Sequence, residues 1–230
     1  MDNTHLNSIL NDLNIRDIKD AETDRENREK FEAEELKLIK PGKTIIIDTG
    51  KIIGVENVVD VIIKEIDSNT HIISIEGVSG TGKTDTANAL HDRLGTIKLS
   101  FGEIFRYLTY RTIQDPNVNY SDIFKNLNYK IEDDKIHFYD KDVNVSEKHF
   151  TDLREKELED LLPHIAAKIQ KNVISFTASE IERLRANLKK IVLLEGRGYT
   201  LDFLPSDLRI KLVADPKIRA ERRLAQEFKK

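Results

Sequence analysis

The chain has 230 residues and a formal net charge of −4, and 39% of its residues are hydrophobic. That apolar content is enough for the core of one globular domain. The negative net charge disfavours a nucleic-acid-binding protein, because such proteins usually carry a strongly positive surface. The sequence has no run of about 18 apolar residues, so no membrane-spanning helix is expected. The lack of cysteine excludes a disulfide framework. We therefore expect a cytoplasmic domain of mixed α/β structure that binds neither nucleic acid nor membrane, and we further expect it to be a monomer.

The first forty residues are polar and carry a helical signal. Apolar residues at helical spacing predict a short amphipathic helix over residues 1–15. Residues 16–40 are dense in mixed charge, which is typical of a solvated helix or a mobile segment. Pro41 and Gly42 then mark a turn.

Beyond this turn, short apolar runs alternate with helical patterns. Buried strands are predicted over residues 44–48, 71–76, 96–100, 191–195 and 209–215. Helices are predicted over residues 56–66, 84–94, 105–113, 152–190 and from Pro216 to the end. Residues 115–150 are polar, with a hairpin expected around 135–145. Strands that alternate with helices are typical of a parallel sheet wrapped by helices, so we expect an α/β fold.

One glycine-rich sequence carries chemistry. Residues 77–84 (GVSGTGKT) satisfy the pattern G-x-x-x-x-G-K-[ST] between a predicted strand and a predicted helix. Glycines let backbone N–H groups turn toward phosphate oxygens, and the helix start adds partial positive charge. We expect Lys83 to reach the β- and γ-phosphates of ATP and the Thr84 hydroxyl to ligate Mg²⁺. The predicted nucleotide-binding residues are Gly77, Ser79, Gly80, Thr81, Gly82, Lys83 and Thr84.

The rest of the sequence narrows the class of nucleotide-binding protein. No Asn-Lys-x-Asp motif is present, which disfavours switch GTPases, and the length disfavours large motor ATPases. Small-molecule kinases fit the size.

From Ile72 onward the sequence resembles bacterial cytidylate kinase, a nucleoside monophosphate kinase. Four segments carry the resemblance in order: ISIEGVSGTGKT (73–84), LSFGEIFRYLT (99–109), LLEGRGYTLDFLP (193–205) and RIKLVADPKIRAERR (209–223). The resemblance implies a P-loop kinase fold, with a five-stranded parallel sheet flanked by helices, a lid and a small acceptor-binding insertion. It also implies ATP-dependent phosphoryl transfer to CMP, dCMP or another nucleoside monophosphate, with Mg²⁺.

Two N-terminal segments resemble segments that in the family lie after the position matching this chain's last residues. Residues 15–28 (IRDIKDAETDRENR) are similar to its lid segment, and residues 44–66 to its closing strand and helix. We therefore predict a circular permutant, with the old termini joined through residues 67–70 and the new termini in the lid. The alternative is a truncated kinase with an unrelated N-terminal extension. Permutation alone predicts that the strand at 44–48 pairs beside residues 209–214.

On this interpretation the chain has six segments. They are the second half of the lid (1–40), the closing strand, helix and linker (41–70), the P-loop core (71–114), the acceptor-binding insertion (115–172), further core (173–215) and the first half of the lid (216–230).

The resemblance also implies roles for single residues. Arg106 and Arg197 match arginines that bind the acceptor's phosphate, and Gly102 belongs to the same acceptor motif as Arg106. Glu195 ends a predicted strand, where a carboxylate can orient the Mg²⁺ shell and where the family usually has aspartate.

Arginines from both arms of the lid are expected to close over the transferring group. The expected catalytic residues are Lys83, Glu195, Arg16, Arg25 and Arg222, and Arg219 and Arg223 are expected to bind the donor. Thr23 stands at the family's spacing for the second lid arginine, so Arg25 requires a two-residue insertion, and Arg28 is a weaker substitute.

The base-reading positions depart from the family pattern. The resemblance implies that polar groups recognise cytosine, namely an Asp after Gly-Arg and a Ser and an Arg on an acceptor-side helix. Here the Asp is Gly198, the Ser falls near Pro163 and the Arg near Asn172. A site without these groups loses discrimination between bases. Another nucleotide, a different small-molecule acceptor and a catalytically inactive nucleotide-binding module therefore stay as alternatives.

Overall fold

The computed structural model describes residues 3–99, 101–133, 135–146, 156–185 and 188–227. The chain divides into two compact units, the first made of Met1–Thr96 with Ile191–Lys230 and the second of Ile97–Lys190. Position 100, inside the acceptor motif at 99–109, and residues 147–155 lie outside the described residues.

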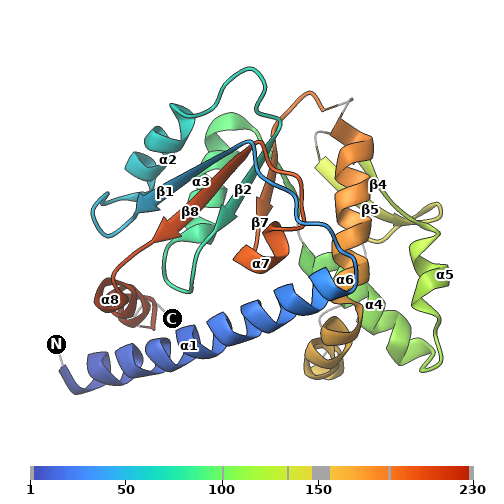
Figure 1. The fold of residues 1–230 in the computed structure, drawn as a ribbon, viewed down its shortest axis with the longest axis horizontal. Helices are drawn as coiled ribbons and strands as arrows, with labels where there is room; N and C mark the ends of the chain where they lie inside the picture. The colour runs from blue at the N-terminus through green and yellow to red at the C-terminus, as the bar shows by residue number, and fades with distance from the viewer. Residues whose placement is uncertain (1–2, 100, 134, 147–155, 186–187, 228–230) are drawn as a thin grey trace. The chain divides into compact units, whose positions relative to one another are not determined.

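The larger sheet has five strands in the order β1-β8-β2-β7-β3, of which β1, β8, β2 and β7 are labelled in Figure 1. Its strands are β1 (Lys43–Asp48), β2 (Ile72–Glu76), β3 (Ile97–Leu99), β7 (Val192–Glu195) and β8 (Leu208–Val213). β8 pairs in parallel with both β1 and β2, and β2 pairs in parallel with β7. The carboxyl ends of these four strands therefore share one edge of the sheet, which is where α/β folds bind ligands.

The pairing of β1 with β8 confirms the contact predicted from the sequence. Ile45 lies opposite Ile210 and Ile47 opposite Leu212 in the parallel register. The N-terminal part of the chain thus supplies an edge strand of the sheet.

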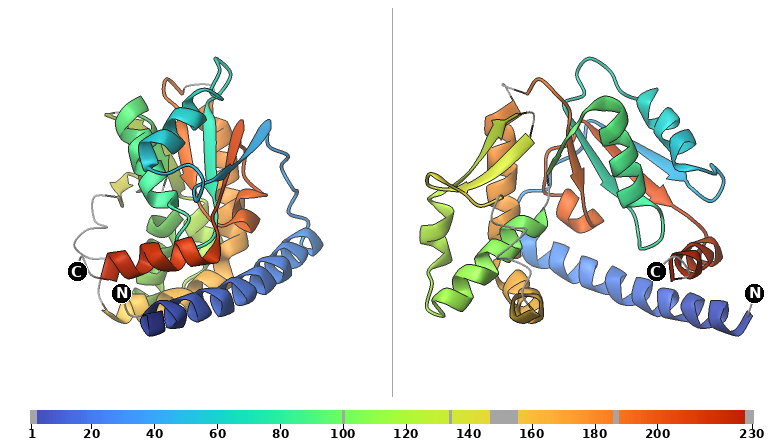
Figure 2. Two further views of the ribbon diagram at one scale, coloured as in Figure 1. Left: turned by 90° about the vertical axis from the view of Figure 1, so that its left-hand side faces the viewer. Right: turned by 180° about the vertical axis from the view of Figure 1, so that it is seen from behind.

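Helices α2 (Val55–Ile63) and α3 (Lys83–Leu94) cover one face of this sheet (Figure 2). Both helices turn an apolar stripe toward the strands, as the sequence pattern predicted. The fully buried residues at this contact are Val59, Ile62, Ile73, Ile75, Leu90 and Ile210.

Helix α1 (Asn3–Ala33) is continuous over 31 residues and packs against α8 (Pro216–Glu227). Figure 1 shows the start of α1 beside α8 and its later turns beside α7 (Gly198–Leu201). Ile9 and Leu13 pack against Ala220 and Leu224. The expected short helix over 1–15 was therefore too short, and the predicted final helix is described as far as Glu227.

The charged stretch of α1 stays helical for two reasons. It is rich in residues of good helix propensity, and charges four residues apart, such as Arg16 and Asp20 at 3.6 Å, pair along its surface. Near its end, Phe31 is buried against Tyr199 and Phe203. This anchor holds the far end of the helix on α7.

The second unit joins helices to a three-stranded antiparallel sheet of order β4-β5-β6. Its elements are α4 (Phe101–Gln114), α5 (Tyr120–Phe124), β4 (Leu127–Glu132), β5 (Lys135–Asp140), β6 (Val143–Asn144) and α6 (Lys156–Arg185). The predicted hairpin is confirmed as β5 and β6, whereas β4 and α5 were not predicted. Tyr129, Phe138 and Phe176 form its aromatic core.

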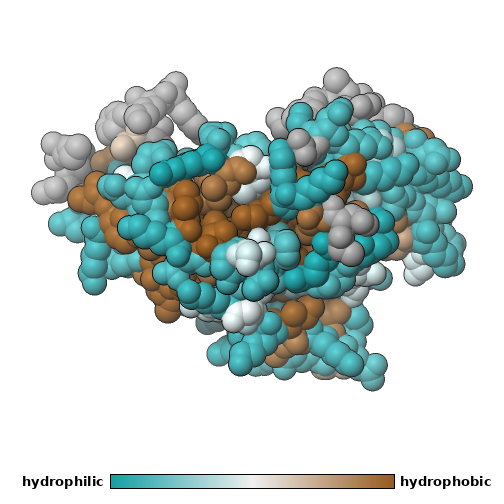
Figure 3. All heavy atoms as spheres, turned by 90° about the horizontal axis from the view of Figure 1, so that it is seen from above, coloured by the Kyte–Doolittle hydropathy of each residue, from teal (hydrophilic) through white to brown (hydrophobic). Residues whose placement is uncertain are grey.

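Within the described residues, no helix is both long and apolar enough to cross a membrane. The face in Figure 3 is largely hydrophilic, with hydrophobic side chains gathered in smaller patches between the polar ones.

We predict that the buried side of β1 contributes to the stability of the whole first unit. Ile47 is 3% exposed and its neighbour Ile46 is 68% exposed. Replacing Ile47 by alanine should lower the free energy of unfolding in urea by about 2–5 kcal/mol, because it leaves a cavity under α2. The matched change Ile46→Ala should cost no more than about 0.5 kcal/mol. Equal effects of the two changes would contradict the assignment of β1 to the core sheet.

Candidate functional site

The glycine-rich loop connects β2 to α3 at the carboxyl edge of the sheet. Gly77 has a φ of +156°, and a Cβ there would lie 2.6 Å from both the Leu212 carbonyl oxygen and Thr81 Oγ1. The loop therefore passes too close to β8 for any residue but glycine at this position. Gly82, with φ 88°, is the N-cap of α3, so the free N–H groups of the first helical turn face the loop.

Lys83, the first residue of α3, lies against the loop. Its Nζ donates to the Val78 carbonyl oxygen at 3.3 Å. Burial lowers the pKa of Lys83, and the neighbouring Glu195 carboxylate partly opposes this shift. The lysine is thus a partly desolvated cation, whose attraction to an anion is stronger than in water.

The two residues predicted to hold a metal ion meet in the structure. The Thr84 hydroxyl donates to Glu195 Oε1 at 2.8 Å, joining the start of α3 to the end of β7. Hydroxyl and carboxylate oxygens suit Mg²⁺, which often takes few protein ligands and completes its shell with phosphate and water. The part of the chain that the structure describes has no group of three or more His, Cys, Asp or Glu residues arranged for a metal.

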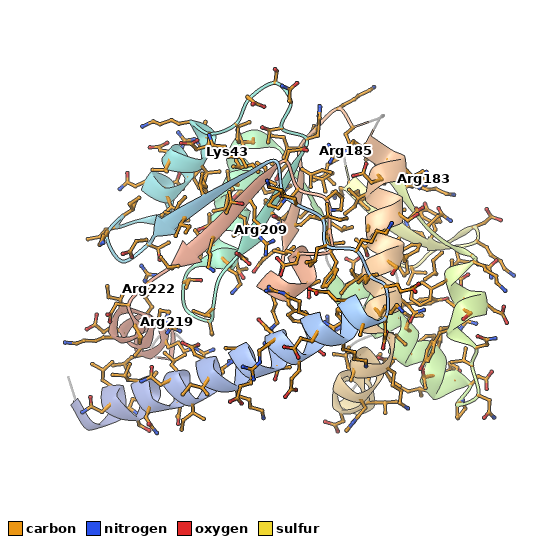
Figure 4. All side chains as sticks on the ribbon, in the orientation of Figure 1. Lys43, Arg183, Arg185, Arg209, Arg219 and Arg222 are labelled. Carbon is orange, nitrogen blue, oxygen red and sulfur yellow. The ribbon has the colours of Figure 1, made fainter. Side chains whose placement is uncertain are left out.

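Three arginines of α8 contact the glycine-rich loop, and two of them, Arg219 and Arg222, are labelled in Figure 4. Arg219 is 2% exposed and donates to the Ser79 carbonyl oxygen at 3.1 Å. Arg222 donates to the Gly80 carbonyl oxygen at 3.2 Å, and Arg223 to Ser79 Oγ at 3.1 Å. Arg219 and Arg223 were predicted to bind the donor nucleotide and Arg222 to be catalytic, and in the structure all three contact the loop.

A cavity of about 340 Å³ lies beside the loop. Its walls come from the loop after β1, α2, the glycine-rich loop, the start of α3 and α8, and include Thr49, Val58, Gly82 and Arg222. Arg222 also donates to the Thr49 carbonyl oxygen at 2.6 Å. The N-terminal part of the chain therefore builds one wall of this cavity, and Thr49 was not predicted from the sequence.

A larger cavity of about 700 Å³ borders the loop at Gly77, Val78 and Ser79. Four cations predicted or weighed as site residues line it, namely Lys83, Arg197, Arg16 and Arg28. The structure thus gathers parts of α1, the glycine-rich loop and the segment after β7 around one space.

Acidic residues of α1 pair with the arginines of this region. Arg197 donates to the Asp20 carbonyl oxygen at 3.0 Å and forms an ion pair with Asp24. Arg219 donates to Asp17 Oδ1 at 3.2 Å. Burial raises the pKa of Asp24, and Arg197 opposes that rise. An anion that binds Arg197 must compete with these carboxylates.

The sequence reasoning missed this acidic row. Asp20 and Asp24 lie four residues apart, and Arg16 and Arg28 flank them at the same spacing. This spacing places all four on one face of a helix, so it is the sequence signal that predicts the row.

The structure does not gather every predicted residue. Arg25 is exposed on α1 and is absent from the cavity wall, where Arg28 lies instead and pairs with Asp202. Gly102 and Arg106 lie on α4, in the second unit, and are described with that unit.

The chain is similar to known cytidylate kinases. The sequence profile of the cytidylate kinase family matches residues 73–230. A cytidylate kinase of Cutibacterium acnes is 28% identical over 172 residues, covering 67% of this chain and 70% of the relative. A cytidylate kinase of Fusobacterium nucleatum is 28% identical over 69% of this chain and 71% of its own length. One of Chlamydia pneumoniae is 30% identical over 66% of this chain and 70% of its own length.

The close approach of the loop to β8 makes a prediction about two glycines. Both Gly77 and Gly82 have positive φ, but a Cβ on Gly82 would meet nothing within 4 Å. Gly82→Ala should therefore cost about 1–2 kcal/mol of unfolding free energy from backbone strain alone. Gly77→Ala adds steric contacts and should cost about 3 kcal/mol or more. Urea unfolding measures both values, and a cost for Gly77→Ala no larger than for Gly82→Ala would refute the close approach.

Proposed function

This chain belongs to the cytidylate kinase family of phosphotransferases, and from that premise we propose that it transfers the γ-phosphoryl group of ATP to CMP or dCMP. The observation that carries the proposal is the glycine-rich loop with Lys83 at its end and three arginines of α8 turned toward it. Phosphoryl transfer depends on positioning and on neutralising charge, and this arrangement supplies both.

The donor side of the proposal uses the loop and α8. Backbone N–H groups of the loop and Lys83 would hold the donor phosphates, since they combine oriented dipoles with a partly desolvated cation. Arg219 and Arg223 lie within hydrogen-bond distance of Ser79, so both are within reach of a phosphate on the loop. The cavity of about 340 Å³ beside the loop would take the nucleoside of ATP.

The pair formed by Thr84 and Glu195 fits Mg²⁺, because both oxygens are hard ligands and the donor phosphates would supply the rest of the shell. When bound there, the ion supplies positive charge to the phosphate oxygens. Lys83 and the α8 arginines would add further positive charge around the same donor phosphates.

The acceptor side of the proposal rests on Arg197 and Arg106. A guanidinium group binds phosphate through two parallel hydrogen bonds, which fixes its orientation. Arg197 lines the cavity of about 700 Å³ together with Lys83. Arg106, with Gly102 in its motif, is proposed to bind the same phosphate on the strength of the family motif. Asp20 and Asp24 would have to release Arg197 as the acceptor's phosphate binds.

The lid residues would close the site against water. Arg16 and Arg222 are proposed to contact the transferring group, Arg16 from α1 and Arg222 from α8. Arg25 is exposed on the same helix as Arg16, so a change in α1 would be needed to bring it in. Arg28 already lines the cavity and is the better placed second lid arginine.

A kinase for a different small-molecule acceptor is the second candidate function. Gly198, where the family pattern has an aspartate, is the observation that favours it. Without that aspartate the site would discriminate less between acceptor bases.

The kinase proposal predicts acceptor-dependent release of ADP. With Mg-ATP and CMP, dCMP, UMP, AMP, GMP or dTMP as separate acceptors, we expect turnover with CMP or dCMP. Lys83→Ala should lower kcat/KM by about 10²- to 10³-fold, because a charge-stabilising donor is lost at the phosphates. Lys125→Ala, which removes an exposed lysine of the second unit, serves as the control and should leave the rate unchanged. Saturable ATP binding without turnover on any of these acceptors would contradict the proposal and favour the second candidate.

We also propose that the chain is a circular permutant of the family's usual order. Two observations support this: β1 pairs in parallel with β8, and α1 packs against α8 through apolar residues. Under this proposal α1 and α8 are the two arms of the lid, and residues 67–70 join the family's old termini.

The permutation proposal predicts that the order of segments can be exchanged. A chain in which residues 71–230 precede residues 1–66 should fold with the same unfolding midpoint to within a few degrees, because it forms the same contacts. Its acceptor KM should be lower, since the two lid arms become covalently joined. Thermal unfolding and steady-state kinetics check both points. Failure of this rearranged chain to fold, beside a folded original, would refute the permutation.

A further inference from the structure

Glu76 occupies the space that a side chain at position 198 would need. It is the last residue of β2, directly before the glycine-rich loop, and is 8% exposed. A Cβ on Gly198 would lie only 2.5 Å from Glu76 Oε2. Glu76 and a side chain at position 198 therefore exclude each other, and the carboxylate that faces this space comes from β2.

Arg209 of β8, labelled in Figure 4, donates a hydrogen bond to this carboxylate. It is 7% exposed and donates through Nη2 to Glu76 Oε2 at 2.7 Å and to the Gly198 carbonyl oxygen at 2.9 Å. Its Nη1 donates to Asp202 Oδ1 at 2.6 Å. One buried guanidinium thus joins the Glu76 carboxylate to the backbone of residue 198 through two hydrogen bonds.

The same carboxylate forms part of the wall of the larger cavity. Glu76 and Gly198 line it together with Lys83 and Arg197. The Glu76 side chain keeps 11% of its surface exposed. Among the described residues, Arg209 is the hydrogen-bond partner of this carboxylate and binds Oε2, which leaves Oε1 for a ligand.

The charge of Glu76 restricts what can bind beside it. A carboxylate only accepts hydrogen bonds, and it repels phosphate. The phosphates of a nucleotide would therefore lie at Lys83 and Arg197, and a hydrogen-bond donor of the nucleotide would lie at Glu76. The exocyclic amino group of cytosine is such a donor, whereas the corresponding oxygen of uracil only accepts.

We propose that Glu76 is a specificity-determining residue, whose carboxylate accepts a hydrogen bond from the amino group of the acceptor base and so favours cytosine over uracil. This inference rests on the proposed kinase function and goes beyond it by naming the group that reads the base. The reading group comes from β2, whereas the family pattern has a base-reading aspartate on the segment after β7.

The variant Glu76→Gln tests the proposal sharply. Arg209 can only donate, so it should hold the amide oxygen and turn the amide NH₂ toward the cavity. The group that faces the base then changes from an acceptor to a donor, which matches uracil. The ratio of CMP to UMP affinity should fall by about 10- to 100-fold, measured by calorimetry on the full chain.

Asp202→Asn is the matched control. It alters the other carboxylate on Arg209, whose two oxygens are taken by Arg209 and Arg28. This change should affect CMP and UMP binding equally. Should Glu76→Gln fail to fold, Gly198→Ala provides a second route, because its Cβ displaces the Glu76 carboxylate, and it too should lower the ratio.

The outcomes separate this inference from the proposed function. A folded Glu76→Gln variant with an unchanged ratio of CMP to UMP affinity, beside a wild type that binds both, overturns the inference and leaves the kinase proposal standing. Equal weakening of CMP and UMP, with dCMP unaffected, would assign Glu76 to the ribose and also overturn it. A wild-type chain that binds no nucleoside monophosphate would overturn both.

Discussion

The parallel pairing of β8 with both β1 and β2 is the contact on which the rest of the structure depends. β8 lies between the strand from the N-terminal part of the chain and the strand that leads into the glycine-rich loop. Since all three run in the same direction, the loop after β1, the glycine-rich loop and the start of α8 meet at one edge. Arg222 of α8 can therefore contact both Thr49 and Gly80. Without this pairing, the loop after β1 would not lie next to the glycine-rich loop and α8.

The charges around this edge largely compensate one another. Arginines that face the glycine-rich loop and the larger cavity are paired with carboxylates from α1, as Arg219 is with Asp17 and Arg197 with Asp24. Arg209 is shared in the same way between Glu76 and Asp202. On the proposed function, the phosphates of a bound nucleotide would replace the α1 carboxylates as partners of these arginines. Part of the binding free energy would then be used to break the ion pairs between the arginines and α1.

Local patterns predicted most of the first unit, and long-range contacts account for what was missed. The strand, loop and helix around Lys83 and Thr84 form a contiguous motif, and the contact of β1 with β8 followed from the family resemblance. The length of α1 did not follow, because mixed charge suits an exposed helix and a mobile segment equally. The pair of Glu76 and Arg209 joins distant segments inside the sheet, and no local pattern reports it. In the second unit β4 was missed because it lies in a polar stretch.

A bisubstrate compound, adenosine joined to cytidine through a chain of phosphates, tests the central claim of a two-nucleotide phosphotransferase site most directly. Linking the two nucleosides makes the second binding event intramolecular. The account predicts that the compound binds one to one, about 10²-fold or more tighter than ATP in the same calorimetric titration. Binding no tighter than that of ATP alone would mean that the chain holds one nucleotide only and would contradict the account.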